Sequence, residues 1–155
     1  MTEQEIKRLV SEVVDSLSGE MTLNLALKLT DAVKQKADEM GVKAVVAVSN
    51  AAGNPVSVQC MNDAYIASYD IAVNKAYTVA ALKMPTSALK SLAAPGGELY
   101  GIQFTNGGKI VIFGGGVPLY NKAGKIIGGL GVSGGSEGED TSLAEYGGEI
   151  FKSLL

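Results

Sequence analysis

The sequence contains no histidine and no tryptophan, and its only cysteine is Cys60. A single cysteine excludes an internal disulfide framework, and without histidine a Cys/His zinc site is excluded too. The Ser-His-Asp triad and the Cys-His dyad are also excluded, because both use histidine as the base. Any catalysis in this chain must therefore use other side chains, and we expect no metal site.

Concentrated positive charge and long apolar runs are missing as well. The 13 basic residues are outnumbered by 16 acidic ones, which gives a formal net charge of −3. Nucleic-acid binding needs clustered Lys and Arg, so we expect no nucleic-acid partner. No apolar run approaches the roughly 18 residues of a membrane span, and the charged first ten residues do not resemble a secretory signal. We expect a cytoplasmic protein with no membrane partner.

Glycine is the residue type in clear excess. The chain of 155 residues has the length of one domain and contains 20 glycines, 17 of which lie from Gly96 to Gly148. An average composition would give about eleven. Glycine allows backbone to approach backbone or ligand closely, at an entropic cost. Because this entropic cost recurs at many positions within one half of the chain, we expect the glycines there to serve a structural or ligand-binding role.

Hydrophobic spacing predicts an α+β fold. Helices are expected over residues 3–17, from Thr22 to the stop at Gly41, over Ile66–Lys83, over Ser87–Ala93, and at the C-terminus with Asp140 or Thr141 as N-cap. Strands are expected over Val42–Ser49, Val56–Cys60, Lys109–Phe113, Val117–Asn121 and Lys125–Val132. Strands grouped as hairpins favour a mainly antiparallel sheet of about five strands with helices packed on it. Residues 1–20 form an N-terminal helix and linker, and residues 21–155 form the domain.

Two glycine motifs overlap at Ser133. Residues 129–134 match the dinucleotide pattern G-x-G-x-x-G, but no acidic residue follows about 20 residues later and no βαβ unit can follow, so a dinucleotide site is rejected. Residues 131–135 match the nucleophile pattern G-x-S-x-G, in which Lys75 would have to replace histidine as the base. The alternative is that Ser133 is a turn residue between a strand and the last helix.

Other candidate residues each have a structural alternative. Gly114, Gly115 and Gly116 would form a ligand-contacting loop, or a bulge or subunit contact. Lys75 would be a buried counter-charge for an anionic ligand, although a lone lysine more often extends to solvent. Asp140 would be a site acid, although its place at the start of a helix favours a cap. Cys60 in a strand is expected to be a small core residue.

Several ordered motifs resemble one known family. They are KAYT (75–78), MPT (84–86), PGGELYG (95–101), NGG (106–108), FGGGVPL (113–119) and GVSGG (131–135) followed by Asp140. In this order they resemble the GlcG/HbpS family, which includes the C-terminal domain of PduO-type proteins. The resemblance runs from about Met21 to the C-terminus. It implies a compact profilin-like unit with a central antiparallel sheet, usually assembled into homo-oligomers.

The resemblance also implies haem binding, with links to corrinoid or glycolate metabolism. Because the chain has no histidine, only Tyr, Met, Cys60, Lys or a hydroxyl would ligate the iron. A porphyrin would otherwise be held by shape or at a subunit contact. The expected ligand-binding residues are Lys75, Asn106, Gly114, Gly115, Gly116, Pro118, Ser133 and Asp140.

The first twenty residues lie outside this family resemblance. Residues 5–17 resemble the encapsulation peptides that direct enzymes into bacterial microcompartments. The helix would dock in a groove of a shell protein through an apolar face made of Ile6, Leu9, Val10, Val13, Val14 and Leu17. The alternative is an extra helix that packs on its own domain or on an oligomer partner.

Three functional hypotheses follow. The first is a non-catalytic, oligomeric accessory protein of a microcompartment that binds a tetrapyrrole or a small anionic metabolite. The second is an enzyme in which Lys75 and Ser133 form a base–nucleophile pair. The third is a structural oligomer whose glycines serve subunit packing.

Overall fold

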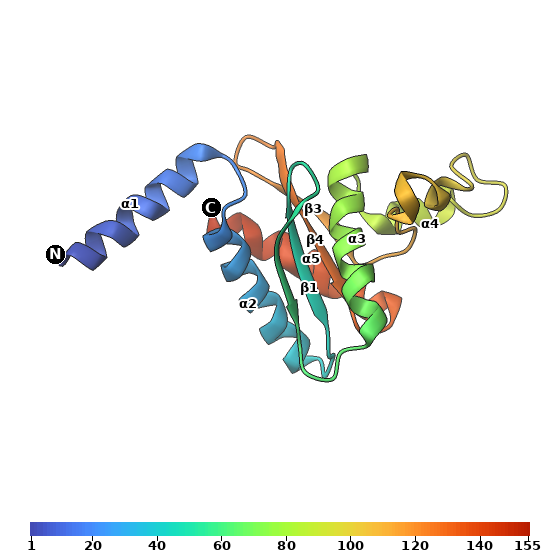
Figure 1. The fold of residues 1–155 in the computed structure, drawn as a ribbon, viewed down its shortest axis with the longest axis horizontal. Helices are drawn as coiled ribbons and strands as arrows, with labels where there is room; N and C mark the ends of the chain where they lie inside the picture. The colour runs from blue at the N-terminus through green and yellow to red at the C-terminus, as the bar shows by residue number, and fades with distance from the viewer.

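The computed structural model covers residues 1–155 and describes every side chain except those of residues 15–18. Its helices are α1 (Glu3–Ser18), α2 (Leu23–Glu39), α3 (Ile66–Leu82), α4 (Thr86–Leu92) and α5 (Glu137–Leu154), with 3-10 turns at Ile102–Phe104 and Asn106–Gly108. Its strands are β1 (Val45–Asn50), β2 (Pro55–Cys60), β3 (Gly116–Tyr120) and β4 (Ile126–Ser133). Figure 1 shows helices on both faces of one sheet, which confirms the predicted α+β class.

The sheet has four strands in the part of the chain that the structure describes, in the order β2-β1-β4-β3, and every pairing is antiparallel. The expected fifth strand, Lys109–Phe113, is wrong. Thr78 on α3 explains why: its hydroxyl accepts from the backbone N–H of Val111 at 3.0 Å, and its one hydrogen lies between the carbonyls of Asn74 at 2.7 Å and Lys109 at 3.2 Å. The backbone of this segment therefore bonds to a helix side chain and not to a strand ladder.

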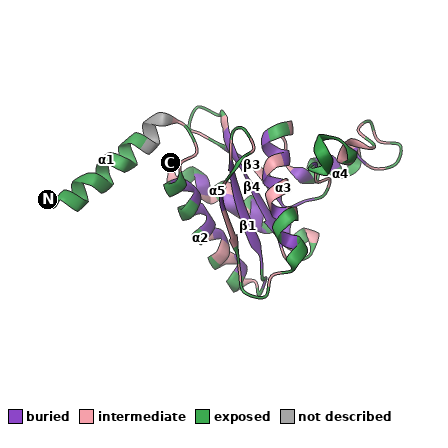
Figure 2. Cartoon of the chain, viewed as in Figure 1, coloured by how far each residue is buried: buried purple, intermediate pink, exposed green. Residues whose placement is uncertain are grey.

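The two faces of the sheet are covered by different helices. On β1, Val46 and Val48 join the larger core cluster, which contains residues of α2 and α5, whereas Val45 and Ala47 pack against α3. This alternation is the period-two pattern of a strand buried on both sides. Buried residues accordingly concentrate along β1 and β4 in the centre of the molecule (Figure 2).

Glycines on β4 allow α3 to lie directly on the sheet. A methyl group added at Gly131 would strike the carbonyl oxygen of Ala72, and one added at Gly129 would strike that of Ala76. Both obstacles are backbone atoms of α3, so they cannot rotate away. Part of the glycine excess therefore serves helix-to-sheet packing.

Helix α1 extends away from the rest of the molecule (Figures 1 and 2). A capping box at Thr2 and Glu5 begins it, and Gly19 ends it in the left-handed conformation with φ 62°. Ile6, Leu9, Val10, Val13 and Val14, the described members of the predicted apolar face, are 43–56% exposed. The side chain of Leu17, the sixth member, lies outside the described residues. None of the helices, over the residues described, has the length and apolarity needed to cross a membrane.

Candidate functional site

A buried ion pair lies where α3, β4 and α5 meet. Lys75 Nζ lies 3.3 Å from Asp140 Oδ2, and these side chains are 0% and 6% exposed. The ammonium also donates to the carbonyl of Val132 at 2.8 Å and lies 5.1 Å from the centre of the Phe113 ring. The expectation that Lys75 extends to solvent is therefore wrong.

Asp140 is the acid of this pair and not the helix cap. Its Oδ1 accepts from the backbone N–H of Gly135 at 2.8 Å. The cap of α5 is Ser136, which forms a capping box with Glu139, so the predicted start of the helix at Asp140 or Thr141 is wrong. Because α5 begins about one turn earlier than predicted, Asp140 lies inside its first turn, where its side chain faces Lys75.

Burial shapes the electrostatics of the pair. Loss of solvent lowers the pKa of Lys75 and raises that of Asp140, because both charged forms are poorly solvated inside the protein. The attraction between the two groups opposes both shifts. The ammonium is thus already engaged by a carboxylate and a carbonyl, and it has no exposed surface with which to meet an outside anion.

Gly115 and Gly116, at the start of β3, lie directly on this pair, and Gly114 lies beside Thr141 and Glu137 of α5. A methyl group added at Gly115 would come within 2.5 Å of Lys75 Nζ, and Gly115 has φ 117°. One added at Gly116 would come within 3.2 Å of Lys75 Cβ. The backbone N–H of Gly114 donates to Glu137 at 3.1 Å, and that of Gly116 donates to Thr86 at 2.9 Å. The glycines therefore let the chain cover a buried charge.

The remaining predicted residues separate into different places. Ser133 is buried and its hydroxyl bonds that of Ser68 at 3.1 Å, so the bonds of Lys75 and Ser133 lead to different partners. Pro118 is buried in β3 opposite Gly129. Asn106 is exposed and accepts from the Tyr77 hydroxyl at 3.0 Å. The structure thus gathers Lys75, the three glycines, Ser133 and Asp140, and leaves Asn106 and Pro118 apart.

A pocket of about 250 Å³, here called the α3 pocket, opens beside this cluster. Its lining comes from the start of α3, the segment before β3 and the junction of β4 with α5: Tyr65, Ala67, Ser68, Ile71, Phe113, Ser133, Gly134, Gly135, Glu137 and Asp140. Ser133 and Asp140 were predicted as site residues, whereas Tyr65 and Phe113 were missed. Phe113 begins the FGGGVPL motif (113–119), which could have pointed to it, whereas Tyr65 lies outside every motif named above.

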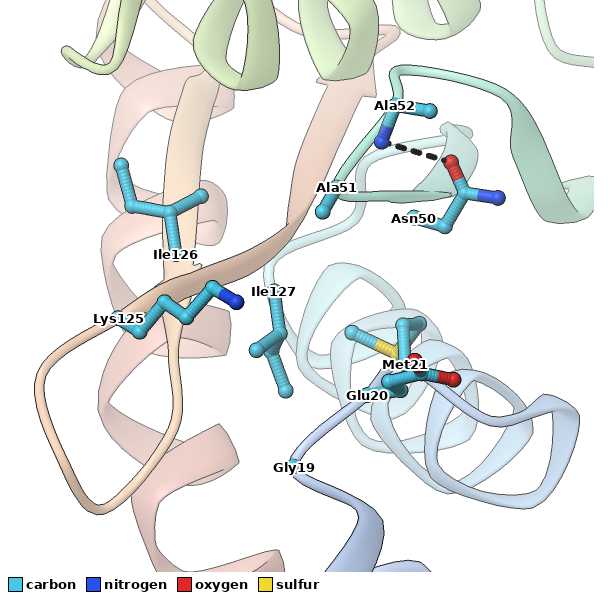
Figure 3. A pocket seen from close by; sticks show the side chains of 9 residues that line it. All are labelled: Gly19, Glu20, Met21, Asn50, Ala51, Ala52, Lys125, Ile126 and Ile127. Carbon is cyan, nitrogen blue, oxygen red and sulfur yellow. Dashed lines mark hydrogen bonds between the residues drawn. The ribbon is translucent and has the colours of Figure 1, made fainter.

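A second pocket, of about 320 Å³, lies at the opposite end of β4 (Figure 3). We call it the linker pocket, because the connection between α1 and α2 forms one wall. The turn between β1 and β2 and the start of β4 form the others, and the lining residues are Gly19, Glu20, Met21, Asn50, Ala51, Ala52, Lys125, Ile126 and Ile127.

The linker pocket combines one cation, Lys125, and one acid, Glu20, with the amide of Asn50 and with thioether and aliphatic surface. Figure 3 shows Met21 across the pocket from Lys125 and Ile127, and the carboxylate of Glu20 directed away from the Lys125 ammonium. Met21 also packs against the core, so its position is supported from behind. No local sequence pattern predicts this pocket, because its walls come from three segments that are distant in the sequence.

Metal-binding side chains do not converge in the described part of the chain. No group of three or more Cys, Asp or Glu residues there is arranged to hold a metal ion. Cys60 is exposed, so its assignment to the core is wrong. The Met61 sulfur accepts from the backbone N–H of Ala44 at 3.4 Å.

These features define the class of the protein first: over the residues described, it is a small α+β protein with a four-stranded antiparallel sheet and solvent-open pockets at both ends of β4. The family follows from the sequence. Residues 21–149 match the model of the haem-degrading protein HbpS-like family, and the chain belongs to that family. The predicted GlcG/HbpS membership is confirmed.

Relatives share most of this chain. An uncharacterised 15.0 kDa protein from the dhaT-dhaS intergenic region of Citrobacter freundii is 44% identical over 86% of this chain and 94% of its own length. The corrinoid adenosyltransferase PduO of the same organism is 36% identical over 90% of this chain, but the match spans only 42% of that protein. The PduO of Salmonella typhimurium is matched over 35% of its length.

Solved structures agree with the fold. Klebsiella pneumoniae ORFY superposes with a TM-score of 0.83 and 40% identity, over 87% of this chain and 92% of that one. A PduOC:heme complex superposes with a TM-score of 0.80 and 35% identity, over 84% and 94%. A Streptomyces reticuli HbpS double mutant superposes with a TM-score of 0.76 and 28% identity, over 84% and 86%.

Proposed function

We propose that this protein is a non-catalytic accessory protein that binds a tetrapyrrole, haem in the first instance, in the linker pocket. The observation that carries the proposal is the placement of Met21 across from Lys125 in a pocket whose lining also includes two isoleucines and two alanines beside Glu20 and Asn50. A relative of 35% identity forms the PduOC:heme complex, which supports the ligand class. When bound, haem supplies an iron centre that changes oxidation state and coordinates small molecules.

The residues of the pocket fit such a ligand. Methionine sulfur is an established haem ligand in proteins, and the chain contains no histidine that would replace it. Ile126, Ile127 and the two alanines offer apolar surface to a macrocycle, and Lys125 offers a cation to its carboxylates. Pockets that enclose drug-sized ligands measure roughly 300–1,000 Å³, so a volume of about 320 Å³ would leave a tetrapyrrole partly exposed.

The α3 pocket suits a small anion less well. Two of its lining residues, Glu137 and Asp140, are acidic, and Lys75 beneath it is already paired with Asp140. An anion entering there would meet carboxylates before reaching any free cation. Lys75 and Ser133 are each hydrogen-bonded to other partners, which disfavours the enzyme hypothesis, because that hypothesis needs them to pair as base and nucleophile. The tetrapyrrole alternative is therefore the one that the geometry favours.

Titration with hemin tests the proposal, with hydroxocobalamin as the corrinoid probe. The wild type should give a shifted Soret band with hemin, and Met21→Leu should change the position and intensity of that band because the sulfur ligand is lost. Met40→Leu is the matched control, since Met40 also packs against the core but lies outside the pocket. Spectra of free hemin throughout, or identical titrations of the two variants, would contradict the proposal.

The turn between β3 and β4 offers a second comparison, because it contains both Lys125 and Lys122. Lys125→Gln should weaken hemin binding about tenfold or more, because a charge-assisted hydrogen bond contributes about 1.5–3 kcal/mol and every 1.4 kcal/mol is tenfold. Lys122→Gln removes the same charge from an exposed position that does not line the pocket. Equal losses in both variants would indicate nonspecific attraction of the anionic ligand.

We also propose that α1 directs the protein into a bacterial microcompartment by docking on a shell protein. The exposed apolar side chains of α1 support this role, because an amphipathic helix gains stability by burying such a face. Residues 1–20 fused to a fluorescent reporter should form puncta in a compartment-forming cell. Val10→Asp should abolish the puncta and Arg8→Asp, off the apolar face, should not. Diffuse signal from the unmodified fusion would end this part of the proposal.

A further inference from the structure

The α3 pocket has no part in the proposed function, yet its lining has the composition of a small-molecule site. Tyr65 and Phe113 contribute aromatic surface to it, and they are 71% and 38% exposed. Its polar side chains are two carboxylates and two serine hydroxyls, besides the hydroxyl of Tyr65. Ligand sites typically combine hydrophobic and aromatic side chains with a few placed polar groups. The pocket therefore offers both kinds of surface that a small organic ligand needs.

The two serine hydroxyls leave one hydrogen-bond donor unused. Ser68 and Ser133 are 3% and 5% exposed, and their hydroxyl oxygens lie 3.1 Å apart. One hydrogen lies between these two oxygens, and no atom of the described residues accepts the second hydrogen. A buried donor without an acceptor is costly, because it has lost its hydrogen bonds to water. A ligand that places an oxygen acceptor in the pocket would satisfy this donor.

The two carboxylates of the pocket offer hydrogen-bond acceptors without a net charge. Asp140 is paired with Lys75 at 3.3 Å, and Glu137 is paired with Lys90 at 2.6 Å. Each carboxylate also accepts from a backbone N–H. A carboxylate has about four lone-pair sites, so each keeps at least one for a ligand. Because both carboxylates already have a cationic partner, neither an anion nor a cation would find an uncompensated charge in the pocket.

We propose that the α3 pocket binds a small neutral polyol. Hydroxyl groups both donate and accept, so one polyol can donate to the carboxylates and accept from the serine pair. Its carbon atoms can pack on the rings of Tyr65 and Phe113. The volume of about 250 Å³ lies below the roughly 300–1,000 Å³ of sites for drug-sized ligands, which favours a chain of a few carbon atoms. This site lies at the other end of β4 from the linker pocket, so it is independent of the proposed haem site.

Titration with three probes of similar size and different charge tests the proposal: glycerol, the anion glycerate and the cation of serinol, an aminopropanediol. Backbone amide shifts in heteronuclear NMR spectra report where each probe binds. Glycerol should shift the amides of Gly134 and Gly135 with a dissociation constant of about 10 mM or tighter. Each charged probe should bind at least about fivefold more weakly. Unchanged amides of these glycines up to about 100 mM glycerol, or tighter binding of either charged probe, would overturn the proposal.

Two variants test whether the pocket itself holds the polyol. Ser68→Ala removes the unused donor, and Ala67→Phe fills the pocket from an exposed lining position on α3, which keeps the test decisive if Ser68→Ala does not fold. Each should weaken glycerol binding at least about fivefold. Ser57→Ala and Ala81→Phe are the matched controls, because Ser57 is also buried, Ala81 is also exposed on α3, and neither lines the pocket.

Equal affinities for glycerol in the variants and their controls would overturn the proposal. Hemin titration of the Ala67→Phe protein separates the two proposed sites, because position 67 does not line the linker pocket. This variant should bind hemin as the wild type does. Loss of hemin binding together with glycerol binding would show that the two ligands share one site, which would also overturn the proposal.

Discussion

Removing the Lys75 ammonium should destabilise the fold strongly. In Lys75→Met the apolar stem is kept and the charge is lost, so Asp140 remains buried with the backbone N–H of Gly135 as its hydrogen-bond donor. Deleting one partner of a buried ion pair costs about 3–5 kcal/mol, because the other charge is left uncompensated. The lost hydrogen bond to the carbonyl of Val132 is part of that cost.

A double variant separates the cost of the uncompensated Asp140 charge from the cost of the lost packing and hydrogen bonds. Adding Asp140→Asn to Lys75→Met removes the stranded charge and keeps an oxygen that can accept from Gly135. The double variant should therefore recover most of the stability and remain about 1–2 kcal/mol below the wild type, the value of one or two neutral hydrogen bonds. Such a recovery of stability would show that most of the cost of Lys75→Met comes from the buried, uncompensated charge of Asp140.

Urea unfolding followed by far-ultraviolet circular dichroism measures these differences, since the chain has no tryptophan for fluorescence. Lys90→Met is the matched control. Lys90 also pairs with an acid of α5, Glu137 at 2.6 Å, but its side chain is 66% exposed, so we expect a loss under about 1 kcal/mol. A loss below about 1 kcal/mol for Lys75→Met, or a double variant no more stable than the single one, would refute the reasoning.

Three further predictions concern packing, pH and α1. Gly131→Ala should cost about 1–3 kcal/mol in urea unfolding because the new methyl meets the α3 backbone, whereas Gly138→Ala, in open space on α5, should be neutral or slightly stabilising. Hydrogen bonds from Lys90 and from the Gly114 backbone lower the pKa of Glu137, so this carboxylate stabilises the fold above its ordinary pKa of 4.5 and that contribution disappears as the pH falls through the lowered value. Glu137→Gln should therefore lose less stability than the wild type between about pH 5 and about pH 3, and parallel curves would contradict this. Removing residues 1–20 should leave the urea midpoint nearly unchanged; a clear drop would show that α1 packs on the domain.

The fold was largely predictable because its signals are local. Caps and glycine stops set the ends of α1 and α2, and short runs of apolar residues and glycine, buried on both faces, form β1 and β4. The failed strand at Lys109–Phe113 has an apolar pattern, but a side chain from α3, Thr78, takes up its hydrogen bonds. Only the tertiary structure places Thr78 beside that segment.

The site was predictable only in part, and for the same reason. The motifs correctly gather Lys75, the glycines and Asp140 in one place, yet they do not reveal that Lys75 and Asp140 neutralise each other inside the protein. Spacing along one chain says nothing about pairing across 65 residues. No sequence motif predicts the linker pocket, because Met21, Asn50 and Lys125 come together only in the folded structure.

The most direct test of the central claim is a crystal structure of the protein grown with hemin, with the iron located by its anomalous scattering. The account predicts the iron in the linker pocket, within bonding reach of the Met21 sulfur, and the carboxylates of the macrocycle on the side of Lys125. An iron peak in the α3 pocket, or one on the surface away from Met21, would contradict it.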